Sequence, residues 1–219
     1  LGPASVQELN DLTFEAFDLA DIYRTPVLIL ADGMMGQMME PVVFPEPLDV
    51  AGLPVKPWKL DGAAGRPSRL ILSLLLDTAI EEELNWKLHR KYETITREIP
   101  AAETFMTEDA RLVVIAYGTA ARIAKGAVKA LREEGIRVGL LRPVTLWPFP
   151  DRAIREMSRS VNDFLAFEMS TGQMVEDVRL ALEGRARVHF YGRPGGIIPT
   201  PDEIAGVLHS RYERSGLGV

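Results

Sequence analysis

The 219-residue chain contains no cysteine. Its residues therefore supply no disulfide, no thiolate zinc site, no catalytic thiol and no ligand for an iron–sulfur cluster. We expect any electron-carrying metal to sit on another chain. The absence of cysteine leaves the redox compartment of the protein open.

The chain also lacks an excess of positive charge and a long hydrophobic run. Its 25 basic and 31 acidic residues give a net charge of −6, which repels a phosphate backbone. Its most apolar stretch, Leu70–Leu76, is far shorter than the ~20 residues that a membrane-spanning helix needs. We therefore expect a soluble, cytoplasmic protein that binds neither nucleic acid nor a membrane.

Apolar residues make up 47% of the chain, which is enough to bury a core in one large domain or two small ones. The chain begins Leu1-Gly2-Pro3, which is neither an initiator methionine nor the basic start of a signal peptide. We therefore expect the sequence to be the later part of a longer protein.

The first elements are predicted from caps and periodicity. Ser5 and Glu8 have the spacing of a capping box, so a helix is expected to begin there. Its apolar pattern ends at Tyr23-Arg24-Thr25-Pro26. The continuous apolar run 27–31 then predicts a strand that is covered on both faces of a parallel sheet, and Asp32-Gly33 ends it.

Proline dominates the next stretch. The prolines between Pro41 and Pro67 prevent a helix or a central strand from propagating, so an extended linker is expected. Apolar residues at steps of three and four from Thr78 to Ile99 then predict one amphipathic helix that bridges two bodies.

Strand and helix patterns alternate after Pro100, which predicts an α/β fold with a parallel sheet. Thr200, Pro201 and Glu203 supply the cap and first turn of the last helix. The expected strands cover residues 112–117, 136–141, 164–167 and 186–191, and the expected helices cover 120–134, 151–160, 172–182 and 201–212.

The carboxyl ends of parallel strands converge on a crevice where such sheets usually bind ligands. Arg142 and Arg193 follow two of these strands and would suit an anion, although the same loops could simply turn the chain or dock a subunit. An NAD site is a weaker hypothesis. Its glycine motif has only Gly118 here, and the second strand of this region ends at Arg142 without an acidic residue.

Three further patterns favour structural roles. Asp32-Gly33 resembles the start of a thiamine diphosphate and magnesium site, but no asparagine follows at the required distance, so we expect no bound metal. The basic stripe on the helix at 120–134 favours a solvated face over a docking site for an acidic partner. The methionines of residues 34–39 favour packing against another domain or subunit. The basic stripe on the helix at 120–134 consists of Arg122, Lys125, Lys129 and Arg132.

Two long stretches carry a family resemblance. The first comprises Gly2–Ser5 and continues through Pro26–Pro41; the second joins Val114–Arg122 to Leu141–Pro150. In these stretches the chain resembles the alpha subunit of thiamine-diphosphate-dependent 2-oxoacid:ferredoxin oxidoreductases, above all the 3-methyl-2-oxobutanoate (2-ketoisovalerate) type. The resemblance runs over essentially all of the chain.

The resemblance implies a domain division. Residues 109–219 are similar to the carboxy-terminal domain of transketolase. Residues 1–44 are similar to the last helix and strand of a truncated domain that binds the aminopyrimidine of thiamine, and residues 45–108 form the linker and amphipathic helix between them. The glutamate and threonine that act in catalysis lie upstream in that family, so no catalytic residue is expected here. The candidate pocket or interface residues are Asp32, Met34, Gln37, Arg142 and Arg193.

The resemblance also implies a function. Such complexes oxidatively decarboxylate a 2-oxoacid to acyl-CoA and pass the electrons to ferredoxin. Thiamine diphosphate and magnesium belong to the beta subunit and the iron–sulfur clusters to other subunits, so this segment is expected to bind none of them alone. Its expected partners are the beta, gamma and ferredoxin-like subunits, ferredoxin, the 2-oxoacid and coenzyme A. We expect this segment to have a mainly architectural role and to be inactive on its own. The alternative is a non-catalytic subunit-assembly or scaffold module.

Overall fold

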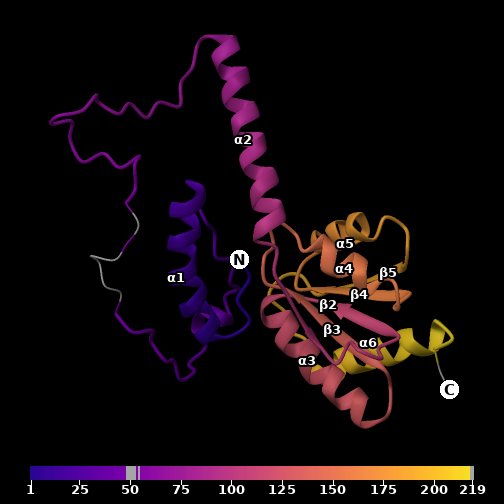
Figure 1. The fold of residues 1–219 in the computed structure, drawn as a ribbon. Coiled ribbons are helices and arrows are strands. Elements are labelled where there is room, and N and C mark those ends of the chain that lie inside the picture. Colours follow the sequence, from indigo (N-terminus) through magenta and orange to yellow (C-terminus); the bar gives the residue numbers. More distant parts are fainter. Residues whose placement is uncertain (48–52, 54, 218–219) are drawn as a thin grey trace.

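The computed structural model describes residues 1–47, 53 and 55–217. A sheet with helices on both faces forms the main body, helix α2 projects from it, and the described residues 55–77 ahead of α2 lie away from the sheet (Figure 1).

The sheet has five strands in the order β1-β3-β2-β4-β5. The four strands from β2 to β5 are parallel, whereas β1 is antiparallel to β3, with Ala102 opposite Pro143. The expected α/β fold with a largely parallel sheet is therefore confirmed. The strands are β1 Ala102–Phe105, β2 Leu112–Ile115, β3 Val138–Pro143, β4 Asp163–Glu168 and β5 Arg187–Gly192.

Helices cover both faces of the sheet (Figure 1), and an apolar core lies beneath the helices on each face. Helices α3 (Gly118–Glu133) and α6 (Pro201–Arg214) cover one face, where Phe167 and Leu208 are fully buried. Helices α4 (Asp151–Met157) and α5 (Met174–Leu182) cover the other, with Phe164 and Ile154. Successive residues of each buried strand enter opposite cores, because side chains alternate across a strand.

Strand β1 was not anticipated from the sequence. Its four residues are half exposed, and their polar composition gives no apolar run. The loop that follows β1 lies close to β3: a Cβ on Gly139 would lie 2.6 Å from the carbonyl oxygen of Met106. The sheet therefore begins at residue 102, within the range expected to be linker and helix; the division into domains itself stays a prediction.

Helix α1 (Val6–Tyr23) starts as the capping box predicts. The Ser5 hydroxyl accepts the Glu8 N–H at 3.1 Å. The Glu8 carboxylate reaches back to the N–H of Ala4, at 2.7 Å, rather than to that of Ser5. The helix ends at Tyr23 with Arg24 in the left-handed region, ahead of Pro26.

The prediction of a buried strand at residues 27–31 was wrong. The segment is extended, and its hydrogen bonds run to Leu1: the amino terminus donates to the Leu28 carbonyl and the Leu30 N–H donates to the Leu1 carbonyl, both at 2.8 Å. Leu28 is 80% exposed. A buried strand needs sheet neighbours on both sides, and no strand among the described residues lies beside this one.

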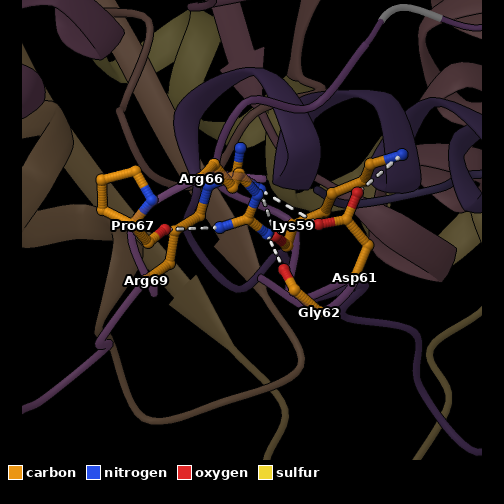
Figure 2. A network of polar contacts seen from close by, with 6 residues as sticks. All are labelled: Lys59, Asp61, Gly62, Arg66, Pro67 and Arg69. Atoms are coloured by element: carbon orange, nitrogen blue, oxygen red, sulfur yellow. Dashed lines mark hydrogen bonds and ion pairs between the residues drawn. The ribbon is translucent and has the colours of Figure 1, made fainter. Parts of the chain in front are cut away.

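The proline-rich stretch from Pro41 to Pro67 forms no helix or strand in its described residues, as the linker prediction requires. Polar contacts nevertheless order part of it (Figure 2). The Asp61 carboxylate faces Arg66 at 2.6 Å and both Lys59 and Arg69 at 3.3 Å. Hydrogen bonds from Arg66 and Lys59 lower the pKa of Asp61 to about 2.

Helix α2 (Thr78–Glu98) confirms the predicted amphipathic helix, but its apolar stripe is only partly covered. Only its carboxyl-terminal end meets the sheet domain, where Ile95 is buried and Tyr92 packs edge-on against Trp147. Ile80, at its start, is 52% exposed. Among the helices of the described residues, none combines the length and apolarity that a membrane span requires.

Candidate functional site

The strand order reverses beside β2, because β3 lies on one side of it and β4 on the other. Ligands of open α/β sheets bind at the carboxyl ends of the strands at such a point. Two cavities, of about 230 Å³ and 580 Å³, lie there and share Asp32 and Met169 in their linings. The smaller is also lined by Tyr117, Gly118, Glu168 and Ser170, and the larger by Gly33, Met34, Gln37, Met38, Gly196 and Ile198.

The Asp32 carboxylate lies on the amino terminus of α3. It accepts the Thr119 N–H at 3.1 Å and the Thr119 hydroxyl at 2.9 Å, as well as the N–H of Met35 at 2.9 Å. The local cap, Tyr117, contributes no side-chain hydrogen bond. Asp32 therefore caps a helix that begins far along the chain and fixes its own turn at the same time.

Glu168 does the same for α5. Its two carboxylate oxygens accept the N–H groups of Gln173, Met174 and Val175 at 2.9–3.1 Å, and the side chain is almost fully buried. Ser170 adds a hydroxyl donor at 2.8 Å. The positive ends of both helices that face the crevice are therefore occupied by carboxylates of this chain.

The pKa of Tyr117 is raised by its surroundings in the crevice. Burial raises the pKa of its phenol, and the negative charges of Glu168 and Asp32 raise it further. Burial acts on Asp32 in the same direction, but the hydrogen bonds from Met35 and Thr119 outweigh it and lower the pKa of this carboxyl. At neutral pH the crevice thus holds the ionised Asp32 carboxylate and the un-ionised Tyr117 phenol, which can donate a hydrogen bond.

These residues do not fit a diphosphate or a dinucleotide. The amides of α3 and α5 that would bind phosphate oxygens already serve Asp32 and Glu168, and an added anion would be repelled by both. No group of three or more metal-ligating side chains occurs in the part of the chain that the structure describes. The crevice suits a neutral or apolar ligand group better than an anionic one.

Of the predicted site residues, Asp32, Met34 and Gln37 come together at the larger cavity. Asp32 and the one-turn helix η1 (Met35–Gln37) hold this loop, and Met35 is buried beneath it. Met39 is 97% exposed and lies outside the cavity lining.

Arg142 and Arg193 lie apart from the crevice. The buried Arg142 guanidinium faces Glu8 at 2.7 Å and Glu103 at 2.8 Å, and donates to the Gly2 carbonyl at 3.1 Å. Arg193 is paired with Glu203 at 2.6 Å. Both cations are therefore engaged by internal carboxylates.

A second arginine joins the first segment of the chain to the sheet domain. Arg122 donates to the Ala4 carbonyl at 3.0 Å and to Glu40 at 2.7 Å, and Glu40 also accepts the first N–H of α1, that of Val6. Arg122, Arg142 and Asp32 thus form an inter-segment clamp. The sequence predicted Glu8 only as a helix-capping residue, and it did not predict the contacts of Glu40, Tyr117 and Glu168, because side chains that meet distant helices leave no local pattern.

The chain is similar to one protein family and to several curated proteins. Residues 110–204 match the family described as pyruvate:ferredoxin oxidoreductase core domain II. Ketoisovalerate oxidoreductase subunit VorB of Methanothermobacter marburgensis is 46% identical over 90% of this chain, and that of Methanothermobacter thermautotrophicus is 45% identical over 99%. The chain spans 55% and 60% of the length of these two relatives.

A more distant relative and a solved structure extend the comparison. The 2-oxoglutarate synthase subunit KorA of Methanothermobacter thermautotrophicus is 32% identical over 95% of this chain and 62% of its own length. A 2-oxoglutarate:ferredoxin oxidoreductase from Magnetococcus marinus, solved with 2-oxoglutarate, coenzyme A and succinyl-CoA bound, superimposes with a TM-score of 0.74. At 19% identity over 96% of this chain and 41% of that one, it shows a shared fold.

Proposed function

We propose that this chain belongs to the 2-oxoacid:ferredoxin oxidoreductase subunit family and works within an enzyme that oxidatively decarboxylates a 2-oxoacid to an acyl-CoA, with ferredoxin as electron acceptor. The observation that carries the proposal is the 45–46% identity to VorB, which extends over 90–99% of the chain. Thiamine diphosphate would supply the carbanion-stabilising chemistry from elsewhere in the complex.

The proposed substrate is a branched-chain 2-oxoacid. Identity to the ketoisovalerate subunits is 45–46%, whereas identity to two 2-oxoglutarate subunits of the same genus is 32–34%. The second candidate is 2-oxoglutarate itself, supported by those KorA relatives. The carboxylates at the crevice favour the first candidate, because a second carboxylate on the substrate would face Asp32 and Glu168.

We assign this segment a mainly architectural role. The clamp fixes the loop of Met34 and Gln37 against the sheet domain, so that this loop can form one wall of a pocket completed by other residues of the complex. The chain provides hydrogen bonds and packing there, and its lack of cysteine leaves electron transfer to iron–sulfur centres on partner subunits. The proposed partners are the remaining subunits of the complex.

Steady-state kinetics of the assembled complex containing this chain test the activity. The assay measures coenzyme A-dependent reduction of a one-electron viologen dye, with thiamine diphosphate and Mg²⁺ present. We expect 3-methyl-2-oxobutanoate to have the highest kcat/KM, about tenfold above that of 2-oxoglutarate. No reduction with any 2-oxoacid would disprove the activity, and turnover by this chain alone would disprove the architectural role.

The alternative is an assembly or scaffold module that takes no part in the pocket. A matched pair of variants separates the two roles: Met34→Ala changes the cavity lining, whereas Met39→Ala changes an exposed thioether nearby. A pocket wall predicts that only Met34→Ala raises the KM for the 2-oxoacid, by about threefold to tenfold, in a complex of unchanged composition. Equal kinetics for both variants would favour the scaffold.

A further inference from the structure

A groove of about 530 Å³ lies on the opposite side of α3 from α6, outside the crevice. The exposed face of α3 forms one wall, strands β1 and β3 form the floor, and the start of α1 closes one end. Its lining includes Phe105, Leu140, Lys125, Lys129, Glu103 and Ser5.

The basic stripe of α3 divides into two kinds of residue in the structure. Its outer arginines serve the fold: Arg122 pairs with Glu40, and Arg132 pairs with Asp109 at 2.7 Å while donating to the carbonyl of Val138. These arginines are therefore unavailable to a partner.

The inner lysines remain free for a partner. Lys125 and Lys129 are exposed, lie one turn apart on the groove wall, and form no ion pair with the residues that the structure describes. The ammonium group of Lys125 lies 5.1 Å from the ring centre of Phe105, which holds it at the edge of the floor.

The floor between the lysines and β1 is apolar. Leu140 is almost fully buried and Phe105 is half-buried, and both belong to the core that α3 covers. Strand β1 is the edge of the sheet. The groove thus combines an apolar floor with one cationic wall in a chain whose net charge is −6.

We propose that this groove docks an acidic, amphipathic segment of another polypeptide chain. Apolar side chains of that segment would cover Phe105 and Leu140, and its carboxylates would face Lys125 and Lys129. A small polyanion is less suitable, because the other buried cation of the lining, Arg142, is saturated by Glu8 and Glu103. Two lysines on one wall cannot surround a phosphate group.

A fluorescein-labelled peptide in which glutamates alternate with leucine and phenylalanine at helical spacing is the probe, and fluorescence anisotropy with the full chain measures its affinity. We expect binding that weakens with added NaCl and falls about tenfold in the double variant Lys125→Glu, Lys129→Glu. The matched control is Lys87→Glu, Arg90→Glu, which makes the same charge change on the exposed face of α2 and should leave the affinity unchanged.

Amide chemical shifts locate the contact. Perturbations by the acidic peptide that centre on Phe105, Lys125 and Lys129 support the proposal. Equal loss of affinity in both double variants would overturn it, since only the net charge would then matter. It would also be overturned if inorganic pyrophosphate displaced the peptide from the same residues, or if sedimentation showed a dimer of this chain that the Lys125→Glu, Lys129→Glu variant abolishes.

Discussion

The sheet domain and the segment before it use their apolar residues differently. In residues 102–217 two clusters of apolar side chains are buried on the two faces of the sheet, although Leu180 is 72% exposed. In the preceding segment Phe17 of α1 is 72% exposed and Leu28 is 80% exposed. The sheet domain therefore contains its own core. The segment that precedes it is held to the sheet domain largely by carboxylates and arginines, which suits a part of the protein that completes a surface formed with other residues.

Removing one phenyl ring from each region should give the largest difference in the free energy of unfolding. Phe164→Ala leaves a cavity in the core beneath α4 and α5, so we expect the free energy of unfolding to fall by about 3–5 kcal/mol. Phe17→Ala removes an exposed ring and should change it by less than about 0.5 kcal/mol. Urea denaturation measures both. A similar loss for the two variants would mean that α1 is packed as tightly as the sheet.

Breaking the clamp should have the next largest effect. Arg142→Met removes a buried guanidinium shared by Glu8 and Glu103, and we expect a loss of about 1.5–3 kcal/mol. Amide hydrogen exchange should accelerate in α1 before it does in β2. The control Arg152→Met breaks an exposed pair on α4 and should cost less than about 0.5 kcal/mol. Uniform acceleration across both regions would contradict a local clamp.

Asp32→Ala removes the cap that the first segment places on α3. We expect a loss of about 1–2 kcal/mol at neutral pH, comparable with other helix caps. The pKa of Asp32 is lower in the folded protein than its ordinary value of 3.8, so its contribution is complete above that value. The stability difference between wild type and variant should shrink as the pH falls through the lower, folded-state pKa.

Thr200→Ala is the matched control, because the Thr200 hydroxyl caps α6 within the sheet domain. It should cost about 1 kcal/mol, with a pH dependence that does not follow a carboxyl group. Thermal unfolding at a series of pH values distinguishes the variants. Parallel pH profiles would contradict the assignment of Asp32 as an ionised cap.

The smallest predicted effect is an increase in the free energy of unfolding. A Cβ on Gly126, inside α3, would lie 3.5 Å from the Cβ of Pro201, an ordinary van der Waals contact. Gly126→Ala should therefore raise the free energy of unfolding by about 0.5–1 kcal/mol, because alanine loses less backbone entropy in a helix. Gly139→Ala is the opposite control and should destabilise, since its Cβ would meet the Met106 carbonyl oxygen. Destabilisation by Gly126→Ala would indicate tighter α3–α6 packing.

Most elements of the sheet domain could be predicted because their signals are local. The apolar runs of β2 and β3 and the cap of α6 each depend on neighbours in the chain, as does the amphipathic pattern of α2 ahead of this domain. The error at residues 27–31 has a physical reason. An apolar run specifies burial, but the partners that would cover it are not specified by the run itself.

The candidate site was less predictable. The family resemblance was enough to name Asp32 and Gln37 as candidate pocket residues, and both line the larger cavity. Arg142 was named as a candidate because it follows a strand, but its guanidinium is paired with Glu8 and Glu103. Side chains can satisfy a helix end from any distance along the chain, so the carboxylates on α3 and α5 had no periodic signature.

The sequence by itself determined the alternation of strands and helices, the absence of thiolate chemistry and the start of the first and last helices, because these depend on composition and near neighbours. Only the tertiary structure decided that Asp32 and Glu168 occupy the helix ends at the crevice and that Lys125 and Lys129 border an open groove. Those outcomes depend on which distant charges meet, and electrostatic pairing is settled by the folded geometry.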